Sequence, residues 1–429
     1  MRRLPLLATL LAVLATGGTV QAVSADTFAA GTSDRAAAGG TNILVAGVDT
    51  RRGLSRETIN KLHVGGEGCD CTDVLMLVHL SADGKRASAV SLLRDSYVEF
   101  APHDHPRHHG KINGAYQHGG PDLAMRTVER ATGLKVDHYL QADFPGFAAA
   151  VDDLGGATVC TAEPLADKNS GLRLDPGTHH VDGNGALRYA RARHVPPPGD
   201  GGRVRRQHRL LAGMLERLRT GGAFADLPSA ARTARTLLRS VRTDPGTSPL
   251  ELARLGLALG KVRDTEFATV PVADWDHRVP QWGSTVRWHG RRAATLWKAL
   301  REDRPVTGDQ GVLPGGAVAV DMPPTFVQVR AADGRVARAL RANGFDVRGR
   351  GPVAAAGGER TVITYDPRWQ RYAPTLAAAL PGARLDPVAG HGPVFDVRPG
   401  TDRQRTARVV FDRTAVQGAP VSGESLLCR

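Results

Sequence analysis

Short apolar runs in the first half of the chain predict strands that are buried on both faces. The runs lie at residues 43–46, 74–78 and 87–93, and a further strand is predicted at Tyr139–Ala142. Continuous apolar runs of this length are typical of central strands with a layer packed on each side. The pattern therefore predicts a layered fold.

Helices are predicted between and after these strands. One begins at Pro121-Asp122 and ends near Gly133, with the acidic residue in the first turn, where negative charge is favourable. Another covers Phe144–Leu154 and ends at Gly155-Gly156. The remaining elements are a basic amphipathic helix at 203–219, helical structure continuing to about residue 262, a strand at Phe267–Val272 and a helix at Arg291–Leu300. Strands alternating with helices predict an α/β fold.

A second, smaller α/β domain is predicted after a linker rich in glycine and proline at Pro305–Pro324. Its elements are a strand at 326–329, a helix at Arg335–Asn343 closed by Gly344, a strand at Arg360–Tyr365, a helix ending at Leu380 and a strand at Val394–Val397. The predicted organisation is a signal or anchor at 1–25, a linker at 26–40, a large domain at 41–303, a linker at 304–322, the small domain at 323–398 and a polar tail at 399–429.

The N-terminus predicts export from the cytoplasm. Met1-Arg2-Arg3 precedes an apolar run from Leu4 to Ala15, and Val23-Ser24-Ala25 has the small residues of a cleavage site. The segment is marginal in length for a membrane-spanning helix. A cleaved secretory signal and a retained anchor both remain open, and either would place the rest of the chain in the cell envelope.

The charge balance predicts attraction to polyanions. The 429 residues include 56 Lys and Arg against 43 Asp and Glu, which gives a formal net charge of +13. An exported chain does not meet DNA, so anionic lipid or phosphate-rich wall polymer is the expected partner and nucleic acid is not. The four cysteines, Cys69, Cys71, Cys160 and Cys428, permit disulfides in an exported protein, with three pairings open.

A pair of aspartates is the first candidate for chemistry. Asp49 follows one apolar run and Asp73 directly precedes another. If the two strands are neighbours, both carboxylates face one cleft. Magnesium is usually held by one or two carboxylates while phosphate oxygens complete its coordination. Taken alone, each aspartate is better explained as a turn or capping residue.

A series of arginines is the second candidate. Arg94 ends the third apolar run, Arg191 and Arg193 are two apart, and Arg203 and Gln207 are four apart at the start of a helix. If residues 191–193 are extended, both side chains point the same way, and the helical pair shares one face. Guanidinium groups bind phosphate bidentately, so the series predicts a pyrophosphate site. A solvated basic surface is the alternative.

Other chemistry finds little support in the sequence. The tract from His103 to His109 has the composition of a metal-binding segment but no fixed scaffold, and we interpret it as a solvated loop. The sequence contains no phosphate-binding GxxxxGK[ST] loop, no GxSxG elbow and no HExxH zinc motif.

Taken in order, these segments resemble the LytR-CpsA-Psr family of bacterial wall-polymer transferases. The matching stretches are Gly47–Arg51, Thr72–Val78, Ser91–Asp95, Lys111–Tyr116, His138–Phe144, Val151–Gly156, Gly185–Arg193 and Asp200–Gln207. No single stretch is decisive, whereas the ordered set is specific. Residues 323–398 also look like the LytR C-terminal domain of actinobacterial relatives.

The resemblance implies a fold and an activity. The implied fold is a three-layer α/β/α sandwich with an apolar channel, and the implied enzyme is a Mg²⁺-dependent phosphotransferase, with Mn²⁺ as an alternative metal. Its substrates would be a polyprenyl pyrophosphate-linked glycan at the membrane surface and peptidoglycan. It would transfer the phospho-glycopolymer to a peptidoglycan hydroxyl during wall assembly.

The resemblance also implies roles for individual residues. Asp49 and Asp73 would hold the metal, and Arg94, Arg191, Arg193, Arg203 and Gln207 would bind the pyrophosphate. Arg94 would stabilise developing charge, and Asp73 would help deprotonate the acceptor hydroxyl. A polyprenyl pyrophosphate hydrolase and a non-catalytic binder of anionic wall polymer are the alternatives. A transcription regulator is disfavoured, because the chain is exported and shows no helix-turn-helix pattern.

Departures from the family pattern weaken one expected contact. Many relatives carry an arginine two residues before the second aspartate, where this chain has Cys71. One phosphate ligand is then missing, unless Arg51 or Arg52 replaces it. Many relatives also have proline at the position of Leu93, and most carry a longer cytoplasmic segment than the three residues before this apolar run.

Overall fold

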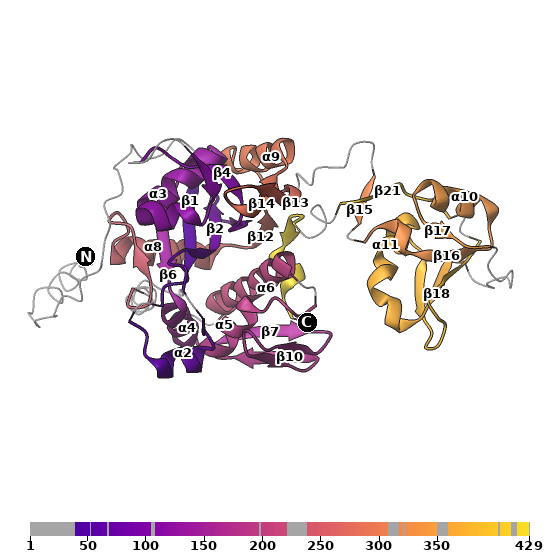
Figure 1. The fold of residues 1–429 in the computed structure, drawn as a ribbon, viewed down its shortest axis with the longest axis horizontal. Coiled ribbons are helices and arrows are strands. Elements are labelled where there is room, and N and C mark those ends of the chain that lie inside the picture. The colour runs from indigo at the N-terminus through magenta and orange to yellow at the C-terminus, as the bar shows by residue number, and fades with distance from the viewer. Residues whose placement is uncertain are drawn as a thin grey trace, which may run out of the picture.

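A computed structural model describes residues 39–428 apart from 52, 67, 104–107, 197–198, 221–237, 308–316, 321, 350–358, 402–403 and 413–417. Its main body is built on a seven-stranded sheet in the order β11-β6-β1-β2-β3-β12-β22 (Figure 1). The central strands are β1 (Thr41–Val48), β2 (Thr72–Leu80) and β3 (Arg86–Leu92), with β6 (His138–Ala142) and β12 (Asp264–Thr269) outside them. The N-terminal segment predicted as a signal or anchor lies outside the described residues.

Helices cover both faces of this sheet, as the buried strands predicted. On one face, Leu44, Leu75 and Val90 pack in a single core with residues of α3 (Gly114–Thr132) and α9 (Gly290–Arg301). On the other face, Met76 and Ala89 pack with residues of α6 (Gly199–Thr220). Helices α4 (Phe144–Asp153), α5 (Gly183–Arg191) and α8 (Pro249–Lys261) lie on this second side as well (Figure 1). The three-layer α/β/α prediction is therefore confirmed.

The chain builds short local structures around these layers. Helix α2 (Arg56–Leu62) follows β1, and small antiparallel pairs form between β4 (Tyr97–Glu99) and β5 (His109–Lys111), β7 (Ala157–Thr161) and β10 (Gly177–Val181), β8 (Leu165–Asp167) and β9 (Leu172–Leu174), and β13 (Val272–Val279) and β14 (Gly283–Trp288). Among the described residues, no helix combines the length and apolar character that a membrane span requires.

Some predicted elements differ from those observed. Helix α3 begins before Pro121, and Gly119 and Gly120 have non-helical backbone angles, so the proline follows a kink. The predicted helical stretch to residue 262 is wrong at its centre, because β11 (Arg242–Thr243) joins the sheet edge there. The histidine tract is not all loop either, since His109 pairs with Glu99.

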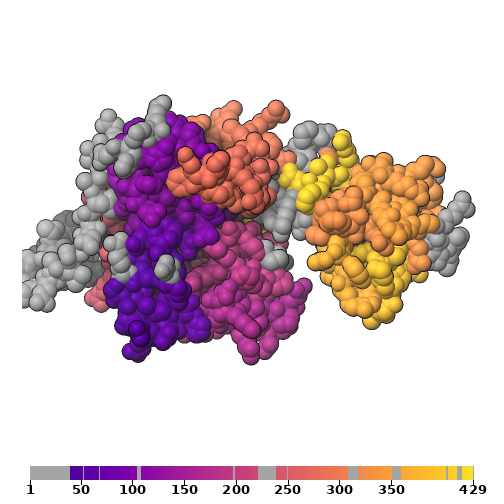
Figure 2. Space-filling view, viewed as in Figure 1, coloured from indigo at the N-terminus to yellow at the C-terminus, as the bar shows by residue number. Residues whose placement is uncertain are grey.

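A second body follows residue 317, and in a space-filling view it stands beside the first as a separate mass (Figure 2). Its sheet has five strands in the order β17-β16-β20-β18-β19, made by Asp346–Val347, Gln328–Ala331, Phe395–Arg398, Val362–Tyr365 and Arg384–Pro387. Helices α10 (Gly334–Ala342) and α11 (Ala373–Ala379) pack on it. Strands β15 (Val318–Val320) and β21 (Val409–Phe411) pair at its margin. The predicted strand at 326–329 starts later, because Pro324–Phe326 form a 3-10 turn.

The last residues of the chain return to the first body. Strand β22 (Val421–Ser422) pairs with β12, and the 3-10 turn Gly423–Leu426 packs Leu426 beside Met76 and Phe267. A disulfide joins Cys428 to Cys160 at the end of β7. The segment predicted as a polar tail therefore contributes a strand and a covalent link to the large domain.

Removal of the Cys160–Cys428 disulfide is expected to destabilise the large domain by ~2–4 kcal/mol, because the crosslink restricts the unfolded chain. It joins residues 268 apart, whereas the other disulfide, Cys69–Cys71, joins residues two apart. Chemical denaturation of a Cys160→Ser/Cys428→Ser variant measures the change. A Cys69→Ser/Cys71→Ser variant is the control and should lose much less. Equal denaturation midpoints for the wild type and the Cys160/Cys428 variant would contradict the prediction.

Candidate functional site

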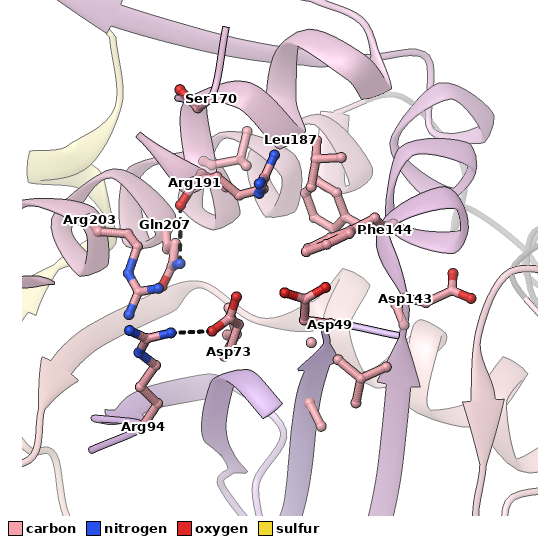
Figure 3. Close-up of a pocket in the computed structure, with 18 of the residues that line it drawn as sticks. Asp49, Asp73, Arg94, Asp143, Phe144, Ser170, Leu187, Arg191, Arg203 and Gln207 are labelled. Atoms are coloured by element: carbon pink, nitrogen blue, oxygen red, sulfur yellow. Dashed lines mark hydrogen bonds and ion pairs between the residues drawn. The ribbon is translucent and has the colours of Figure 1, made fainter. Parts of the chain in front are cut away.

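A cavity of about 420 Å³ opens at one edge of the seven-stranded sheet, between the strands and helices α4, α5 and α6 (Figure 3). Strands β1 and β2 are antiparallel, so the end of β1 lies beside the start of β2. A register shift after Gly47 lets the backbone N–H of Asp49 donate to the carbonyl oxygen of Cys71 at 2.9 Å. This pairing brings the carboxylates of Asp49 and Asp73 to the same wall of the cavity.

The structure brings every predicted site residue to this one cavity. The residues are Asp49, Asp73, Arg94, Arg191, Arg193, Arg203 and Gln207. Arg94 follows β3, which runs antiparallel to β2 and ends at the same sheet edge. Arg203 and Gln207 lie one turn apart on α6, as predicted. Their shared location is a structural finding, and their roles in binding and catalysis stay predictions.

The condition that residues 191–193 are extended is not met. Arg191 is the last residue of α5, and Arg193 lies just beyond the helix. Asp182 caps the start of α5 by accepting a hydrogen bond from the backbone N–H of Gly185, and the helix buries Ala186, Leu187 and Tyr189. The two arginines reach the cavity from a helix terminus, so their common direction does not come from strand alternation.

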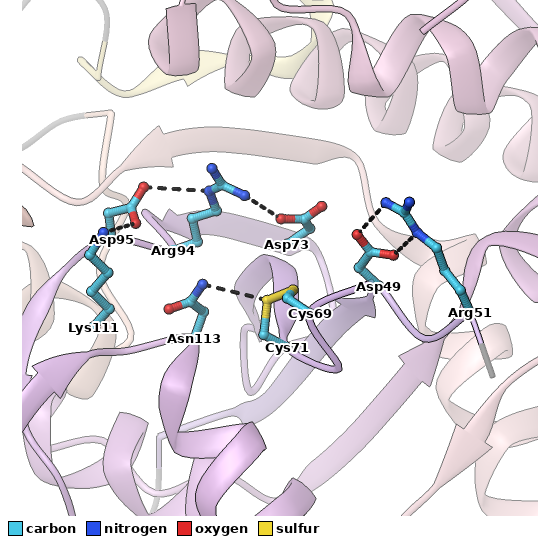
Figure 4. The surroundings of a disulfide bond; sticks show 9 residues. All are labelled: Asp49, Arg51, Cys69, Cys71, Asp73, Arg94, Asp95, Lys111 and Asn113. Atoms are coloured by element: carbon cyan, nitrogen blue, oxygen red, sulfur yellow. Dashed lines mark hydrogen bonds and ion pairs between the residues drawn. A yellow bond between two sulfur atoms is a disulfide. The ribbon is translucent and has the colours of Figure 1, made fainter. Parts of the chain in front are cut away.

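Two ion pairs organise the acidic wall. The guanidinium of Arg51 binds Asp49 through two contacts, of 2.6 Å from Nε to Oδ1 and 2.7 Å from Nη2 to Oδ2. Arg94 Nη1 donates to Asp73 Oδ1 at 2.6 Å, and Arg94 Nε lies 3.4 Å from Asp95 (Figure 4). Each candidate metal ligand is therefore held by a cation, in geometry typical of strong arginine–carboxylate pairs.

Burial and charge shift the pKa values of the groups around the cavity. Burial raises the pKa of Asp73, but Arg94, Arg203 and Arg193 outweigh it, so the pKa lies below its ordinary value. Burial lowers the pKa of Arg203 to about 10, against the opposing effect of Asp200. Burial, with repulsion from Arg51, also lowers the pKa of Arg191. Buried cations that repel one another favour the binding of an anion. Its negative charge would offset their repulsion and compensate for the water that burial removed.

Apolar side chains form much of the remaining cavity wall. They are Val45, Val48, Val74, Met76, Phe144, Phe147, Leu187, Leu210 and Leu211, from the sheet and from helices α4, α5 and α6. The cavity therefore combines charged groups with many hydrocarbon side chains. This combination fits a ligand with a phosphate head and an apolar tail.

The donor set fits a hard divalent cation when phosphate completes the coordination. Two carboxylates, Asp49 and Asp73, share the wall, which is the protein contribution that Mg²⁺ usually takes beside phosphates. No group of three or more His, Cys, Asp or Glu side chains among the described residues converges in a way that could hold a metal ion. A cation held by these two aspartates would therefore take its remaining ligands from phosphate or water, and the metal stays a prediction.

Cys71, where the family resemblance led us to expect an arginine, forms a disulfide with Cys69 (Figure 4). Cys71 is 5% exposed, and Asn113 Nδ2 lies 3.7 Å from its sulfur. Of the two proposed replacements, Arg51 lines the cavity, and Arg52 lies outside the described residues. Arg51 thus lies where it could supply the missing phosphate contact, although it binds Asp49 in this structure.

A second group of cavity residues was not predicted, and most of it lies at the end of β8 and in the turn that leads to β9. Asp167, Asn169 and Ser170 line the cavity together with His194. The only sequence signal was a run of turn-forming residues, Asp167-Lys168-Asn169-Ser170-Gly171. Asp95 and Lys111 do not line the cavity, but they lie next to Arg94, and sequence analysis assigned them no role in the site. Lys111 Nζ lies 3.0 Å from Asp95 Oδ1, so this carboxylate is shared between Lys111 and Arg94.

The carboxylate of Asp167 is held by backbone donors. Oδ1 accepts from the N–H groups of Asn169 at 2.9 Å and Ser170 at 3.4 Å. Oδ2 accepts from those of Arg193 at 2.7 Å and His194 at 3.1 Å. Burial raises the pKa of Asp167, but these four hydrogen bonds outweigh it and lower the pKa to about 2.

The Asp167 contacts are expected to make stability depend on pH in acid. A carboxyl group with a folded-state pKa of about 2, below its ordinary 3.8, stabilises the fold fully above about pH 4. That contribution is lost as the pH falls toward 2. Denaturation of wild type and Asp167→Asn between pH 6 and pH 2.5 tests this. The wild type should lose its advantage over the variant as the pH falls, and a constant difference would contradict the assignment.

The fold and the cavity together define a class of protein. It is an α/β/α sandwich whose cavity, at one edge of the central sheet, is lined by arginines, aspartates and many apolar side chains. Residues 15–301 match the sequence profile of the LytR_cpsA_psr family. The chain therefore belongs to the LytR-CpsA-Psr family.

Individual relatives support this membership. The chain is 36% identical over 277 residues to the probable cell wall biosynthesis protein LcpB of Corynebacterium glutamicum, covering 61% of each chain. It is 31% identical over 274 residues to cell wall biosynthesis protein LcpA of the same species, covering 56% of this chain and 52% of that one. The matches thus span less than two thirds of these relatives.

Solved structures agree on the fold. Bacillus subtilis TagV has a TM-score of 0.50 at 24% identity, with 62% of this chain and 98% of that chain covered. A Streptococcus agalactiae protein has a TM-score of 0.52 at 22% identity, with 62% and 88% covered. At such low identity, these similarities show the shared fold and carry nothing about substrate.

Proposed function

We propose that this protein transfers a phospho-glycopolymer from a polyprenyl pyrophosphate carrier to a hydroxyl group of peptidoglycan. The observation that supports it best is a single cavity that combines five arginines, two aspartates at neighbouring strand ends and many apolar side chains. The corynebacterial relatives are named as cell wall biosynthesis proteins, which supports the same role. The reaction would take place in the cell envelope, at the membrane surface that faces away from the cytoplasm.

The arginines would bind and position the pyrophosphate. Arg94, Arg191, Arg193 and Arg203 approach the cavity from β3, α5 and α6, so they can contact a diphosphate from several directions. Gln207 adds a neutral donor, and its Nε2 already donates to the Ala190 carbonyl oxygen at 3.2 Å. In phosphoryl transfer, positioning and charge stabilisation supply most of the catalysis. These side chains would therefore carry most of the rate enhancement.

Asp49 and Asp73 would hold a magnesium ion, or manganese in its place, which would act as a Lewis acid on the phosphate oxygens. Both carboxylates would exchange contacts when substrate enters, because Arg51 and Arg94 bind them here. Those two guanidinium groups would then be available to the phosphates. The ion pairs thus keep the acidic wall neutralised before the pyrophosphate arrives.

The chemical step would break the phosphoanhydride bond of the pyrophosphate and form a phosphate ester bond to peptidoglycan. The acceptor hydroxyl oxygen forms a bond to the sugar-bearing phosphorus, and the bond from that phosphorus to the bridging oxygen breaks. Polyprenyl phosphate leaves with the bond electrons, and the hydroxyl proton passes to a base. Asp73 is our candidate for that base. Its lowered pKa keeps it ionised at neutral pH, and a loose transition state needs only a weak base.

A turnover assay tests the proposal. The full chain in detergent would be mixed with labelled polyprenyl pyrophosphate-linked sugar and peptidoglycan fragments, with and without Mg²⁺. Label on peptidoglycan that depends on metal would support the transferase. Release of sugar phosphate into water would instead favour a polyprenyl pyrophosphate hydrolase. Binding without turnover would leave the non-catalytic binder.

A further inference from the structure

The turn between β8 and β9 is fastened directly to the arginine segment that would bind the pyrophosphate. Asp167, only 3% exposed, accepts two backbone hydrogen bonds from its own turn and two from Arg193 and His194. One buried carboxylate thus fixes the positions of two chain segments that are 26 residues apart. Any group presented by this turn keeps a constant relation to Arg193.

The turn and the neighbouring His194 present polar groups to the cavity. Ser170 is 3% exposed, and its hydroxyl group has no hydrogen-bond partner among the described residues. Asn169 and His194 stand at the exposed rim above it, with 3.4 Å between Asn169 Nδ2 and His194 Nδ1. A buried hydroxyl without a partner costs free energy, and a ligand that hydrogen-bonds to it removes that cost.

We propose that Ser170, Asn169 and His194 form a sugar subsite next to the pyrophosphate site, with Asp167 as its positioning residue. The inference deepens the proposed function and rests on it. Hydroxyl, amide and imidazole groups both donate and accept hydrogen bonds, which matches the hydroxyl and amide groups of a sugar. The arginines suit phosphate, and the apolar wall suits the lipid, so this polar corner suits the remaining part of a glycosylated carrier.

The sugar could reach this corner from two sources with the same chemistry. One is the first sugar of the lipid-linked donor, attached to the pyrophosphate beside Arg193. The other is the peptidoglycan sugar that carries the acceptor hydroxyl. Kinetics separate them, because a donor subsite changes the KM for the glycosylated lipid and an acceptor subsite changes the KM for peptidoglycan fragments.

The test compares Ser170→Ala and Asn169→Ala with the wild type in binding and turnover. The ligands are polyprenyl pyrophosphate without sugar and the same lipid carrying one sugar. Each variant should bind the glycosylated lipid about five- to tenfold more weakly, or raise the KM for peptidoglycan fragments by that factor, from the loss of one hydrogen bond. Affinity for the sugar-free lipid should stay unchanged. Ser284→Ala is the matched control, because Ser284 is an exposed residue of strand β14 whose hydroxyl group donates to Asp276.

Asp167→Asn gives the complementary result. It should weaken the binding of both lipids, because Asp167 holds the backbone of Arg193 as well as that of Ser170. A merely structural role would lower the melting temperature and leave both affinities, and both KM values, at wild-type levels in the folded fraction.

The outcomes separate this inference from the proposed function. If the wild type binds neither lipid, both ideas fail. If the wild type binds both lipids, and Ser170→Ala and Asn169→Ala change neither the sugar-dependent affinity nor the KM for peptidoglycan, the sugar subsite alone is overturned. A selective loss for one sugar source establishes the subsite and identifies which sugar occupies it.

Discussion

Asparagine in place of Asp73 is expected to lower the transfer rate on the order of 10²–10³-fold. The substitution preserves the shape of the side chain and removes its charge. A metal ion supplies several kcal/mol of transition-state stabilisation, and about 1.4 kcal/mol corresponds to a tenfold change in rate. Asp73 is also the candidate base for the acceptor hydroxyl. Asp49→Asn should show a similar loss through the metal alone.

Metal titrations distinguish these two roles. If Asp49 serves only as a ligand, raising the Mg²⁺ concentration should partly restore Asp49→Asn, whereas Asp73→Asn should recover less. Asp143→Asn is the matched control, because Asp143 lines the same cavity while its carboxylate caps α4 through the Gly146 N–H at 2.8 Å. Asparagine is also a good cap, so this variant should keep its activity. Wild-type turnover by both Asp49→Asn and Asp73→Asn would remove the proposed metal site.

The strands of the large domain could be predicted because burial leaves a direct trace in the sequence. The apolar run at 74–78 lies within β2, and alternate residues face the two helical layers, with Leu75 in one core and Met76 in the other. The approach of Asp49 to Asp73 followed once β1 and β2 were assumed to be neighbours. That adjacency is a property of the fold, and the resemblance to a family supplied it.

Other parts of the site depend on contacts that local sequence does not encode. Asp167 contacts Arg193 and His194 across 26 and 27 residues, so its own turn gives no sign of them. Strand β22 is two residues long, and its place in the large sheet depends on β12, far back in the chain. The pairing of Cys160 with Cys428 depends on that same return of the chain. Patterns of three to ten residues cannot report such long-range contacts.

The extended arrangement considered for Arg191 and Arg193 is absent for a local reason. Spacing by two aligns both side chains only on an extended segment, whereas Asp182 followed by Gly183-Asn184-Gly185 is an N-terminal capping signal that begins α5. The helix then buries Ala186 and Tyr189. Both arginines still line the cavity, because a helix terminus also delivers them there, and their role in binding stays a prediction. The location of a site residue therefore does not show which element carries it.

Replacement of Arg94 by alanine is expected to lower kcat on the order of 10²–10³-fold, as the loss of a preorganised donor to a developing negative charge does in other enzymes. Arg94 lies between two carboxylates, with Nη1 2.6 Å from Asp73 and Nε 3.4 Å from Asp95, while Lys111 holds Asp95 from its other side at 3.0 Å. The carboxylates raise the pKa of Arg94 above its ordinary value despite burial. The guanidinium group is thus charged and fixed in position before substrate binds.

Lysine at position 94 should restore little of this activity. An ammonium group carries the same charge, but it lacks the planar fork that contacts Asp73, Asp95 and a phosphate at once. Steady-state kinetics of Arg94→Lys and Arg94→Ala, with melting temperatures to confirm folding, measure both effects. Arg126→Ala, which breaks an exposed ion pair with Asp122 on α3, is the control and should keep wild-type kcat. If Arg94→Lys matched the wild type, charge alone would suffice, and the bridging geometry of Arg94 would have no part in catalysis.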